Sequence, residues 1–457
     1  MSRIKEKNTL PEILKITPCN SPINAEVSLP GSKSISNRAL MVAALTPGLT
    51  RLSGILFSRD TWIMITALKK LGLQISINSS EKWVEVLGIK DSIPVLNTKL
   101  DVGNAGTAAR FLTAFLILGK EGIYELDGDE AMRSRPMSGL INALSSMGVS
   151  FYFSQKTDHF PFTMKIPRVV AVEKIMVDAS ASSQILSALI MVLPKLSSRS
   201  SLQTTHPIRR PFVDMTLALM AQFGILIRNH SGIYLCDKVK SNFNCVGSYE
   251  IEPDISAASY FYALPMVVGG TLRIRNAASV QLQGDREFVK ILSSLGLKVM
   301  EQKNDHLINF DPIKQLPILQ KNKHEHIFNF NLFSDTFLTL AAIVPALGIN
   351  VKIEGIEHTR FQETDRVSGM ARELRRIGQK VEEGPSFLRI QSDFINSATI
   401  ETYQDHRFAM SFAILGCSVL FENKPISIRD PFCCGKTFPE FFKVLDQALY
   451  GGNYEDN

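Results

Sequence analysis

Short polar clusters, each followed by an almost wholly apolar stretch, recur at a nearly constant interval along the chain. They occupy residues 31–38, 104–110, 180–184, 253–258, 334–336 and 404–407. Their first residues lie 70 to 81 positions apart, which indicates one structural unit used six times. Polar residues directly before an apolar periodic run are the usual start of a helix. The pattern therefore predicts six helices with polar N-termini.

Each of these helices is followed by a second predicted helix of different character. The first kind is apolar on nearly every face, as in residues 39–45, 111–118 and 185–193, which is typical of a buried helix. The second kind is amphipathic and ends near a glycine, which suits the left-handed position after a helix. These glycines are Gly72, Gly148, Gly224, Gly296 and Gly378. Because strand-like runs separate the helices, the pattern predicts an α/β protein of two domains, each with three units, helices inside and sheets around them.

The composition excludes several classes of protein. With 457 residues, 45% of them hydrophobic and 21% charged, the chain is of ordinary globular composition. The net charge of +6 forms no basic stripe, which argues against nucleic acid but suits small anionic substrates. The six cysteines form no disulfide framework, and no apolar stretch reaches the roughly 20 residues that span a bilayer. Since no signal peptide is evident, we predict a cytoplasmic protein that does not bind membranes.

Cationic and hydroxyl side chains gather at the first three helix starts. Lys33, Ser34 and Arg38 lie in the first cluster, Gly106 allows close approach to backbone N–H groups in the second, and hydroxyls fill residues 180–184 in the third. Helix N-termini attract anions through unpaired N–H groups and the helix dipole. Taken singly, the first two clusters are explained as well or better by ordinary helix caps and turns.

Two arginine–proline sequences place cations where the helix dipole gives no reason for them. Arg135 precedes Pro136 and Arg210 precedes Pro211, and a proline there suits the first position of a helix. Cations are favoured at the opposite helix end. This placement is mild evidence for an anionic ligand.

The last two clusters bring carboxylates as well as cations. Asp335 is either a base or a helix cap. Glu363 and Arg366 are three residues apart and are predicted to share a helix face, where a surface ion pair would stabilise little. Residues 405–407 (Asp-His-Arg) and Lys436 complete the set. Such groups at nearly every helix start indicate one anion site with acid–base chemistry.

The motifs that contain these residues resemble those of the EPSP synthase (3-phosphoshikimate 1-carboxyvinyltransferase) family. The motifs are residues 29–39, 103–108, 135–136, 182–184, 283–285, 363–366, 405–407 and 436–439. They follow the family's order over residues 20–445, whereas the layout alone is shared with UDP-N-acetylglucosamine carboxyvinyltransferases. The resemblance implies a two-domain inside-out α/β barrel of six βαβαββ units, three per domain. One domain would comprise residues 1–30 plus 253–457 and the other residues 31–252, with a hinge near residues 30 and 252.

The resemblance also implies a reaction of the shikimate pathway, which leads to chorismate and the aromatic amino acids. The enolpyruvyl group of phosphoenolpyruvate would pass to the 5-hydroxyl of shikimate 3-phosphate with release of phosphate, by addition–elimination through a tetrahedral intermediate. Such a reaction needs an acid, a base, and cations for one carboxylate and two phosphates. No metal or organic cofactor is implied, and we expect a monomer.

The family's residue roles carry over to matching positions. Asp335 would be the base at the 5-hydroxyl, Glu363 would handle the methylene proton, and His406 would support phosphate departure. The residues implied to bind shikimate 3-phosphate are Lys33, Ser34, Arg38, Ser182, Ser183, Gln184, Arg210, Asp335, His358 and Gln362. Those implied to bind phosphoenolpyruvate are Lys33, Gly106, Arg135, Gln184, Arg366, Arg407 and Lys436. The fourth cluster has no cation and is interpreted as a structural copy of the repeat.

A few positions depart from the family's pattern. Gln362 stands where the family often has lysine, and His358 where many members have asparagine. Arg209 and Phe212 replace a phosphate-binding serine and a ring-facing tyrosine. Arg209 or Arg210 would restore the affinity for the phosphate group of the substrate, and we predict that Arg210 does so. We therefore expect positive charge to have moved between neighbouring units without being lost.

The same residues leave two alternative functions to consider and predict one inhibitor. The departures at Gln362 and Arg209 favour a paralogous carboxyvinyltransferase with a different hydroxyl acceptor. A non-catalytic protein with this fold would be expected to lack the acid–base pair, which is present here. The retained Gly106 predicts inhibition by glyphosate, the family's competitor of phosphoenolpyruvate, although Phe111 stands where proline is frequent.

Overall fold

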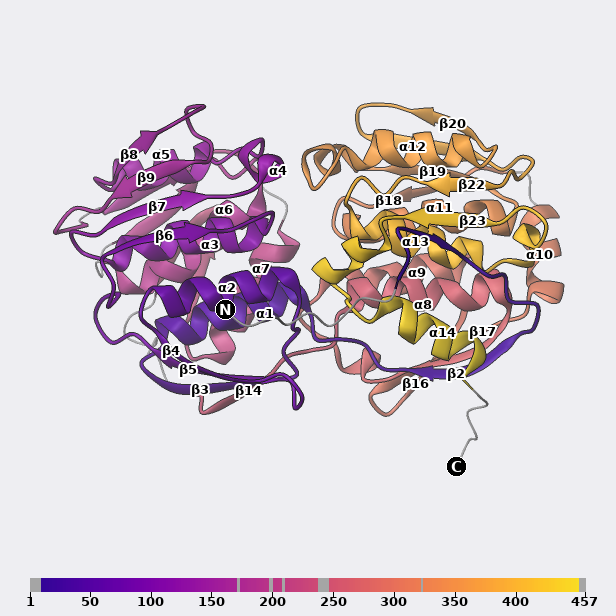
Figure 1. The fold of residues 1–457 in the computed structure, drawn as a ribbon, viewed down its shortest axis with the longest axis horizontal. Helices are drawn as coiled ribbons and strands as arrows, with labels where there is room; N and C mark the ends of the chain where they lie inside the picture. The colour runs from indigo at the N-terminus through magenta and orange to yellow at the C-terminus, as the bar shows by residue number, and fades with distance from the viewer. Residues whose placement is uncertain are drawn as a thin grey trace. The chain divides into compact units, whose positions relative to one another are not determined.

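Figure 1 shows the computed structural model, which describes residues 10–170, 173–196, 200–207, 210–236, 246–321 and 324–451. The chain divides into two compact units. The N-terminal unit comprises residues 30–253 and 281–284, and the C-terminal unit comprises residues 1–29, 254–280 and 285–457.

The N-terminal unit contains three four-stranded sheets, and Figure 1 shows the labelled strands of two of them, β3–β5 with β14 and β6–β9, on its outside. Their strand orders are β14-β3-β5-β4, β6-β7-β9-β8 and β10-β11-β13-β12. Each sheet has one parallel pair followed by two antiparallel pairs. The strands are β3 (Gly48–Ser53), β4 (Gln74–Asn78), β5 (Trp83–Gly88), β6 (Asn97–Asp101), β7 (Ile123–Asp127), β8 (Ser150–Phe153), β9 (Phe162–Lys165), β10 (Lys174–Val177), β11 (Ser201–Thr204), β12 (Ile227–His230), β13 (Ile233–Cys236) and β14 (Ser248–Glu250).

In the C-terminal unit two sheets repeat the four-stranded pattern and the third has three strands, and the N-terminal end of the chain completes two of these sheets. The orders are β16-β17-β15-β2, β18-β19-β21-β20 and β1-β23-β22. β2 pairs parallel with β15, and β1 pairs antiparallel with β23. The strands are β1 (Ile13–Lys15), β2 (Ile23–Val27), β15 (Gly270–Ile274), β16 (Lys298–Gln302), β17 (Asp305–Phe310), β18 (His326–Asn329), β19 (Asn350–Glu354), β20 (Lys380–Glu383), β21 (Phe387–Gln391), β22 (Ala398–Ile400) and β23 (Ile426–Arg429).

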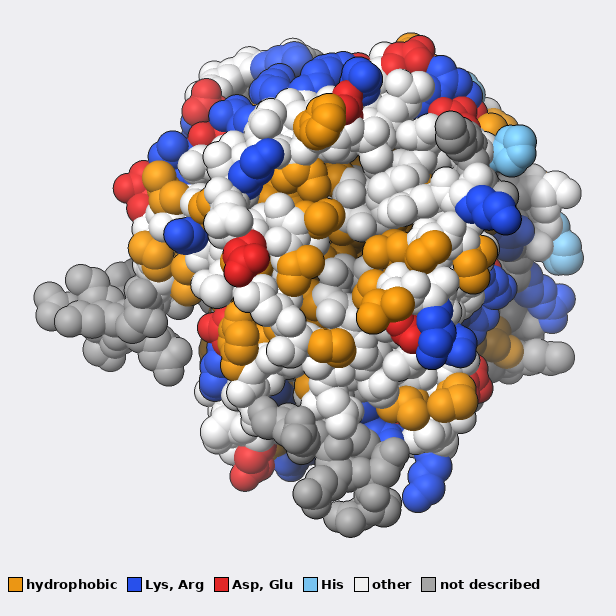
Figure 2. Space-filling model, turned by 90° about the vertical axis from the view of Figure 1, so that its right-hand side faces the viewer, with side chains coloured by type: hydrophobic (Ala, Val, Ile, Leu, Met, Phe, Trp, Pro, Cys, Tyr) orange, Lys and Arg blue, Asp and Glu red, His pale blue; other side chains and the backbone are white. Residues whose placement is uncertain are grey.

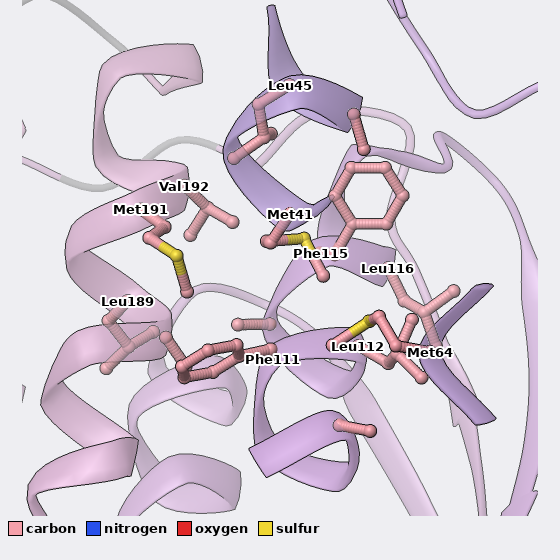
Figure 3. Close-up of a cluster of buried hydrophobic side chains, with 14 of the residues drawn as sticks. Met41, Leu45, Met64, Phe111, Leu112, Phe115, Leu116, Leu189, Met191 and Val192 are labelled. Atoms are coloured by element: carbon pink, nitrogen blue, oxygen red, sulfur yellow. The ribbon is translucent and has the colours of Figure 1, made fainter. Parts of the chain in front are cut away.

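The apolar helices form the core of each unit, so the predicted α/β fold with inner helices is confirmed. Every described residue of α3, α11 and α13 is buried. Figure 3 shows Met41 of α1, Phe111 and Phe115 of α3 and Met191 of α6 packed together. The helices are α1 (Lys33–Leu45), α2 (Arg59–Lys70), α3 (Gly106–Phe115), α4 (Glu130–Arg133), α5 (Ser138–Ser146), α6 (Ser183–Val192), α7 (Pro211–Gln222), α8 (Ile255–Val268), α9 (Phe288–Ser294), α10 (Pro312–Lys321), α11 (Phe337–Leu347), α12 (Arg366–Arg376), α13 (His406–Gly416) and α14 (Phe441–Tyr450).

The helix ends agree with the pattern better than the helix starts do. The five glycines after the amphipathic helices all have φ between +76° and +98°, the left-handed cap that was predicted. Pro211 is the first residue of α7 as predicted, but the helix after Pro136 begins only at Ser138. Glu363 precedes α12 and does not share a helix face with Arg366. Helix starts are harder to place because several polar residues in a row can cap them.

The surface of the C-terminal unit mixes apolar and polar side chains. On the face shown in Figure 2, orange apolar side chains are interspersed with white atoms, and lysines and arginines gather along the upper edge. Single exposed apolar side chains such as Ile313 and Phe394 are ordinary on protein surfaces. Within the described ranges, no helix has the length and apolar character needed to cross a membrane.

Candidate active site

In the N-terminal unit, the first turn of α1 carries Lys33 and Ser34. The side chain of Ser32 accepts the N–H of Ile35 at 3.5 Å and so caps the helix. Lys33 Nζ lies 3.6 Å from the carboxylate of Asp60, a buried residue in the first turn of α2. Asp60 belongs to none of the motifs recognised in the sequence. Its carboxylate stabilises the positive charge of Lys33, which the dipole at the N-terminus of α1 disfavours.

Arg38 is buried one turn further along α1. Its Nε donates to Thr216 Oγ1 at 2.8 Å. Its Nη1 and Nη2 donate to the backbone oxygens of Ser34 at 3.0 Å and Phe212 at 3.2 Å. The guanidinium carbon lies 5.3 Å from the centre of the Phe111 ring, and burial lowers the pKa of Arg38 to about 9. Arg38 therefore fixes the first turn of α1, and with it Ser34, against α7.

The starts of α3 and α6 are joined by a buried arginine that the sequence did not single out. Arg110 donates through Nη1 to the oxygen of Gly106 at 3.0 Å and to Gln184 Oε1 at 3.3 Å. Its Nη2 donates to the oxygen of Pro136 at 3.1 Å. Gln184 in turn donates to Thr107 Oγ1 at 3.3 Å. These oxygen partners hold the guanidinium of Arg110 beside two helix N-termini, where an anion is favoured.

Arg135 lies on the other side of Gly106. Its Nη1 donates to Asn104 Oδ1 at 3.4 Å, and its buried Nε has no hydrogen-bond acceptor among the described residues. A Cβ on Gly106 would lie 2.8 Å from Arg135 Nη1 and 3.0 Å from Arg110 Nη1. The absent side chain therefore allows two guanidinium groups to approach the start of α3, an arrangement suited to a carboxylate or phosphate.

The start of α6 and the start of α7 differ in how much charge they present. Ser182 caps α6 by accepting the N–H of Gln184 at 3.3 Å, and Ser183 is the first residue of the helix. Arg210 is exposed at the start of α7, and its Nη2 lies 3.0 Å from Asp214 Oδ1. Asp214 offsets the charge of Arg210. Arg209, the other arginine considered for phosphate binding, lies outside the described residues.

In the C-terminal unit, Asp335 lies between two arginines. It occupies a 3₁₀ turn (Ser334–Thr336) that leads into α11. Its Oδ1 is 3.1 Å from Arg366 Nη1, and its Oδ2 is 2.7 Å from Arg407 Nη2. The buried Nε of Arg407 has no hydrogen-bond acceptor among the described residues. The two guanidinium groups hold the carboxylate in one orientation through charge-assisted hydrogen bonds.

Arg366, the first residue of α12, links Asp335 to two further carboxylates. Its Nε donates to Asp405 Oδ2 at 2.7 Å, and its Nη2 donates to Glu363 Oε2 at 2.9 Å. Its Nη1 also donates to Gln362. Burial lowers the pKa of Arg366, but the surrounding carboxylates, Asp405 first, raise it by more. Glu363 Oε1 lies 2.9 Å from Lys436 Nζ, so Glu363 also lies between two cations.

The two histidines of the predicted site lie at the edges of this network. His406, the first residue of α13, is buried, with Nδ1 3.7 Å from Asp405 Oδ1. His358 Nε2 lies 2.6 Å from the hydroxyl of Ser334, the residue directly before Asp335. His358 therefore contacts the turn that carries the predicted base.

The fourth helix start contributes a polar group that its sequence did not reveal. Ser256, in the first turn of α8, donates to the buried carboxylate of Asp285. Burial and the nearby charge of Asp335 raise the pKa of Asp285 to about 7, while Ser256 and Arg407 act in the opposite direction. The interpretation of the fourth start as a purely structural copy omitted this pair, because the partner of Ser256 is 29 residues away in the sequence.

The raised pKa of Asp285 has a consequence for stability. A carboxyl group whose pKa is raised by folding stabilises the protein at low pH, and this contribution is lost as the pH rises through the folded pKa of about 7. An asparagine side chain cannot ionise, so Asp285→Asn should gain melting temperature relative to the wild type at pH 8 and gain less or none at pH 5. Thermal unfolding followed by circular dichroism at the two pH values measures this difference. Glu440→Gln, at an exposed position in the same unit, is the control, and an equal difference at both pH values would contradict the prediction.

Comparisons with known proteins agree with this geometry. The sequence model of the EPSP synthase (3-phosphoshikimate 1-carboxyvinyltransferase) family matches residues 18–445. A 3-phosphoshikimate 1-carboxyvinyltransferase of Opitutus terrae is 44% identical over 446 residues, covering 95% of this chain and 97% of the relative. One from Trichormus variabilis is 36% identical, covering 95% of this chain and all of the relative.

Solved structures share the fold. An EPSP synthase from Acinetobacter baumannii superimposes with a TM-score of 0.73 at 21% identity, covering 95% of this chain and 98% of that one. An enolpyruvyl transferase from Streptomyces tendae gives a TM-score of 0.70 at 13% identity, with 95% and 97% covered. The fold and the charged groups define a carboxyvinyltransferase. The chain belongs to the EPSP synthase family, and the predicted family, enzyme class and enolpyruvyl transfer in the shikimate pathway are confirmed.

Proposed function

We propose that the chain transfers the enolpyruvyl group of phosphoenolpyruvate to the 5-hydroxyl of shikimate 3-phosphate, by addition–elimination through a tetrahedral intermediate. The observation that carries the proposal is the ionic network of the C-terminal unit. In it Asp335 and Glu363 each lie between two cations. Carboxyl groups that are held in a fixed orientation by neighbouring cations are positioned to exchange protons with a bound substrate.

In the addition step, Asp335 takes the proton of the 5-hydroxyl as its oxygen attacks C2 of phosphoenolpyruvate. Glu363 enters this step protonated, gives its proton to the methylene carbon and is left as a carboxylate beside Lys436. In the elimination step Glu363 takes a proton back from the methyl group, and phosphate departs with the proton that Asp335 had accepted, assisted by His406. Arg366, Arg407 and Lys436 balance the charge on carboxylate and phosphate oxygens through charge-assisted hydrogen bonds.

In the N-terminal unit, Arg135 and the backbone at Gly106 bind phosphoenolpyruvate, and Lys33 touches both substrates. Ser182, Ser183 and Gln184, at the start of α6, bind the phosphate of shikimate 3-phosphate together with Ser34. The Nε of Arg135 is buried and has no hydrogen-bond acceptor among the described residues, which supports the assignment of Arg135 to phosphoenolpyruvate binding. Arg38 acts on shikimate 3-phosphate through the turn that it holds, since the three hydrogen bonds that its guanidinium donates all go to the protein.

The test is phosphate release by purified protein supplied with phosphoenolpyruvate and a panel of hydroxyl acceptors. Turnover with shikimate 3-phosphate alone supports the proposal, and mass spectrometry should find one enolpyruvyl group on the acceptor for each phosphate released. Turnover with another acceptor only would favour the paralogous enzyme, for which Gln362 and Arg209 are the specific sequence observations. The predicted cytoplasmic location, monomeric state and domain boundaries at residues 30 and 252 stay predictions.

Arg210 offers a narrower test of how the acceptor's phosphate is bound. If Arg210 binds it, Arg210→Ala should raise KM for shikimate 3-phosphate and leave KM for phosphoenolpyruvate unchanged. Because Asp214 competes for the same guanidinium at 3.0 Å, Asp214→Asn should shift the acceptor KM in the opposite direction. Steady-state kinetics with each substrate varied in turn measures both variants. An unchanged acceptor KM in Arg210→Ala would remove this residue from the site.

Glyphosate should inhibit the enzyme in competition with phosphoenolpyruvate. The space beside Gly106 and the two guanidinium groups around it suit a small phosphonate with a carboxylate. Gly106→Ala should weaken inhibition, because the added Cβ displaces the ends of Arg135 and Arg110. Inhibition curves at several phosphoenolpyruvate concentrations test this, and full activity in millimolar glyphosate would refute it.

A further inference from the structure

Two strained residues stand directly before the charged residues of α13. Tyr403 and Gln404 have φ of 55° and 57°. Residues other than glycine avoid this left-handed region because the Cβ crowds the following carbonyl. Among the described residues, no other two consecutive non-glycine residues share it. Asp405 follows at once as the cap of α13.

The phenol of Tyr403 is held by a buried carboxylate that the reaction does not use. Tyr403 Oη donates to Glu373 Oε1 at 2.5 Å and accepts from Arg372 Nη1 at 3.2 Å. Glu373 is fully buried in α12. Its Oε2 accepts the N–H of Glu401 at 3.1 Å and lies 3.0 Å from Arg376 Nε. The partner of the phenol is thus itself fixed by α12 and by the segment that leads to Tyr403.

The ring of Tyr403 is also confined. It packs edge-on against Phe408 of α13, with ring centres 5.4 Å apart at 75°. Gly369 of α12 leaves the space for this pair, since a Cβ there would lie 2.7 Å from Phe408 and 3.4 Å from Tyr403. The side chain is therefore fixed at both ends, by a hydrogen bond at the hydroxyl and by packing along the ring.

The orientation of Asp405 depends on this segment. Asp405 accepts from Arg366 at 2.7 Å and 3.3 Å through its two oxygens, and its Oδ1 also accepts the N–H of Arg407 at 3.0 Å. Arg407 in turn lies 2.7 Å from Asp335. Any relaxation of the two left-handed residues would rotate Asp405 and so move both arginines.

We propose that Tyr403 and Glu373 are positioning residues: their hydrogen bond holds the left-handed pair at 403–404 and thereby fixes Asp405, which orients Arg366 and Arg407 toward the carboxylate and phosphate of phosphoenolpyruvate. The ligand named here rests on the proposed function. Neither residue touches substrate. Their effect passes through the backbone to the arginines.

The experiment compares Tyr403→Phe, Glu373→Gln and the double variant Tyr403→Phe/Gln404→Gly. Tyr403→Phe keeps the ring and removes the hydrogen bond, and should raise KM for phosphoenolpyruvate about tenfold, the size typical for lost supporting contacts. Glu373→Gln should raise KM for phosphoenolpyruvate by a similar factor. KM for shikimate 3-phosphate should be nearly unchanged in both variants. Glycine adopts positive φ without strain, so Gln404→Gly should restore the phosphoenolpyruvate KM. Tyr262→Phe is the matched control, because it removes a hydrogen bond of the same 2.5 Å length, between Tyr262 Oη and His306 Nδ1 in the same unit. It should leave both KM values unchanged.

Hydrogen exchange supplies a readout that needs no substrate. The amides at the start of α13 should exchange faster in Tyr403→Phe and return to the wild-type rate with Gln404→Gly. An unchanged phosphoenolpyruvate KM, an equal rise in both KM values, or no rescue by Gln404→Gly would overturn the proposal. A wild-type enzyme inactive with these substrates would refute the proposed function instead, and unchanged exchange in Tyr403→Phe would still refute the positioning role.

Discussion

Asp335→Asn is expected to lower kcat by about 10²- to 10⁴-fold, the contribution typical of a positioned general base. Asparagine keeps the shape of the side chain and one oxygen to accept from Arg366 or Arg407, but it cannot take the proton of the acceptor. Removing a negative charge that lies 2.7 Å from Arg407 also leaves that cation more available to an anion. The KM for phosphoenolpyruvate should therefore stay the same or fall.

Steady-state phosphate release with each substrate varied measures this split between kcat and KM. Glu440→Gln, at an exposed position in the same unit, should leave both constants unchanged. A kcat within about tenfold of the wild type would fall below the range expected of a general base and would assign proton removal to another group. Melting temperatures of both variants show whether any loss comes from unfolding.

Arg366→Met is expected to destabilise the C-terminal unit by about 3–5 kcal/mol, the cost of breaking a buried ion pair on one side. Methionine fills part of the space, but Asp405, which is 0% exposed, then loses both hydrogen bonds that Arg366 donates to it. Asp335 and Glu363 lose a shared cation in the same step. Urea unfolding at pH 7, followed by circular dichroism, measures the loss.

A double variant separates buried charge from lost volume. Arg366→Met/Asp405→Ser removes both charges, and serine retains the cap that accepts the N–H of Arg407. Much of the lost stability should return, because two neutral partners replace one unpaired charge. Activity should not return, since Arg366 itself is required. If the double variant were less stable than Arg366→Met, buried charge would not be the cause of the loss.

The repeat, the inner helices and the family followed from the sequence because they depend on local patterns. An all-apolar stretch such as residues 337–347 cannot face water, and it forms the buried helix α11. Glycine at positions 72 and 378 takes the left-handed conformation that other residues avoid. The motifs are short stretches of sequence, so Asp335, Glu363 and Arg366 could be predicted to belong to one charged group, and the structure brings them together. The placement of Glu363 on a helix face was wrong, because α12 begins only at Arg366.

The partners of these groups were decided only by the tertiary structure. The pairing of Asp60 with Lys33, the position of Arg110 between two helix starts and the contact of Ser256 with Asp285 were not evident from the sequence, although Arg110, Ser256 and Asp285 lie in its polar clusters and motifs. A carboxylate becomes a base or a neutral acid according to burial and to the charges that the fold brings near it. Local sequence patterns were enough to identify which helices are buried and which residue types stand at their starts. The tertiary structure decided which of those charges meet, because they come from segments tens of residues apart and only the packing of the helices joins them.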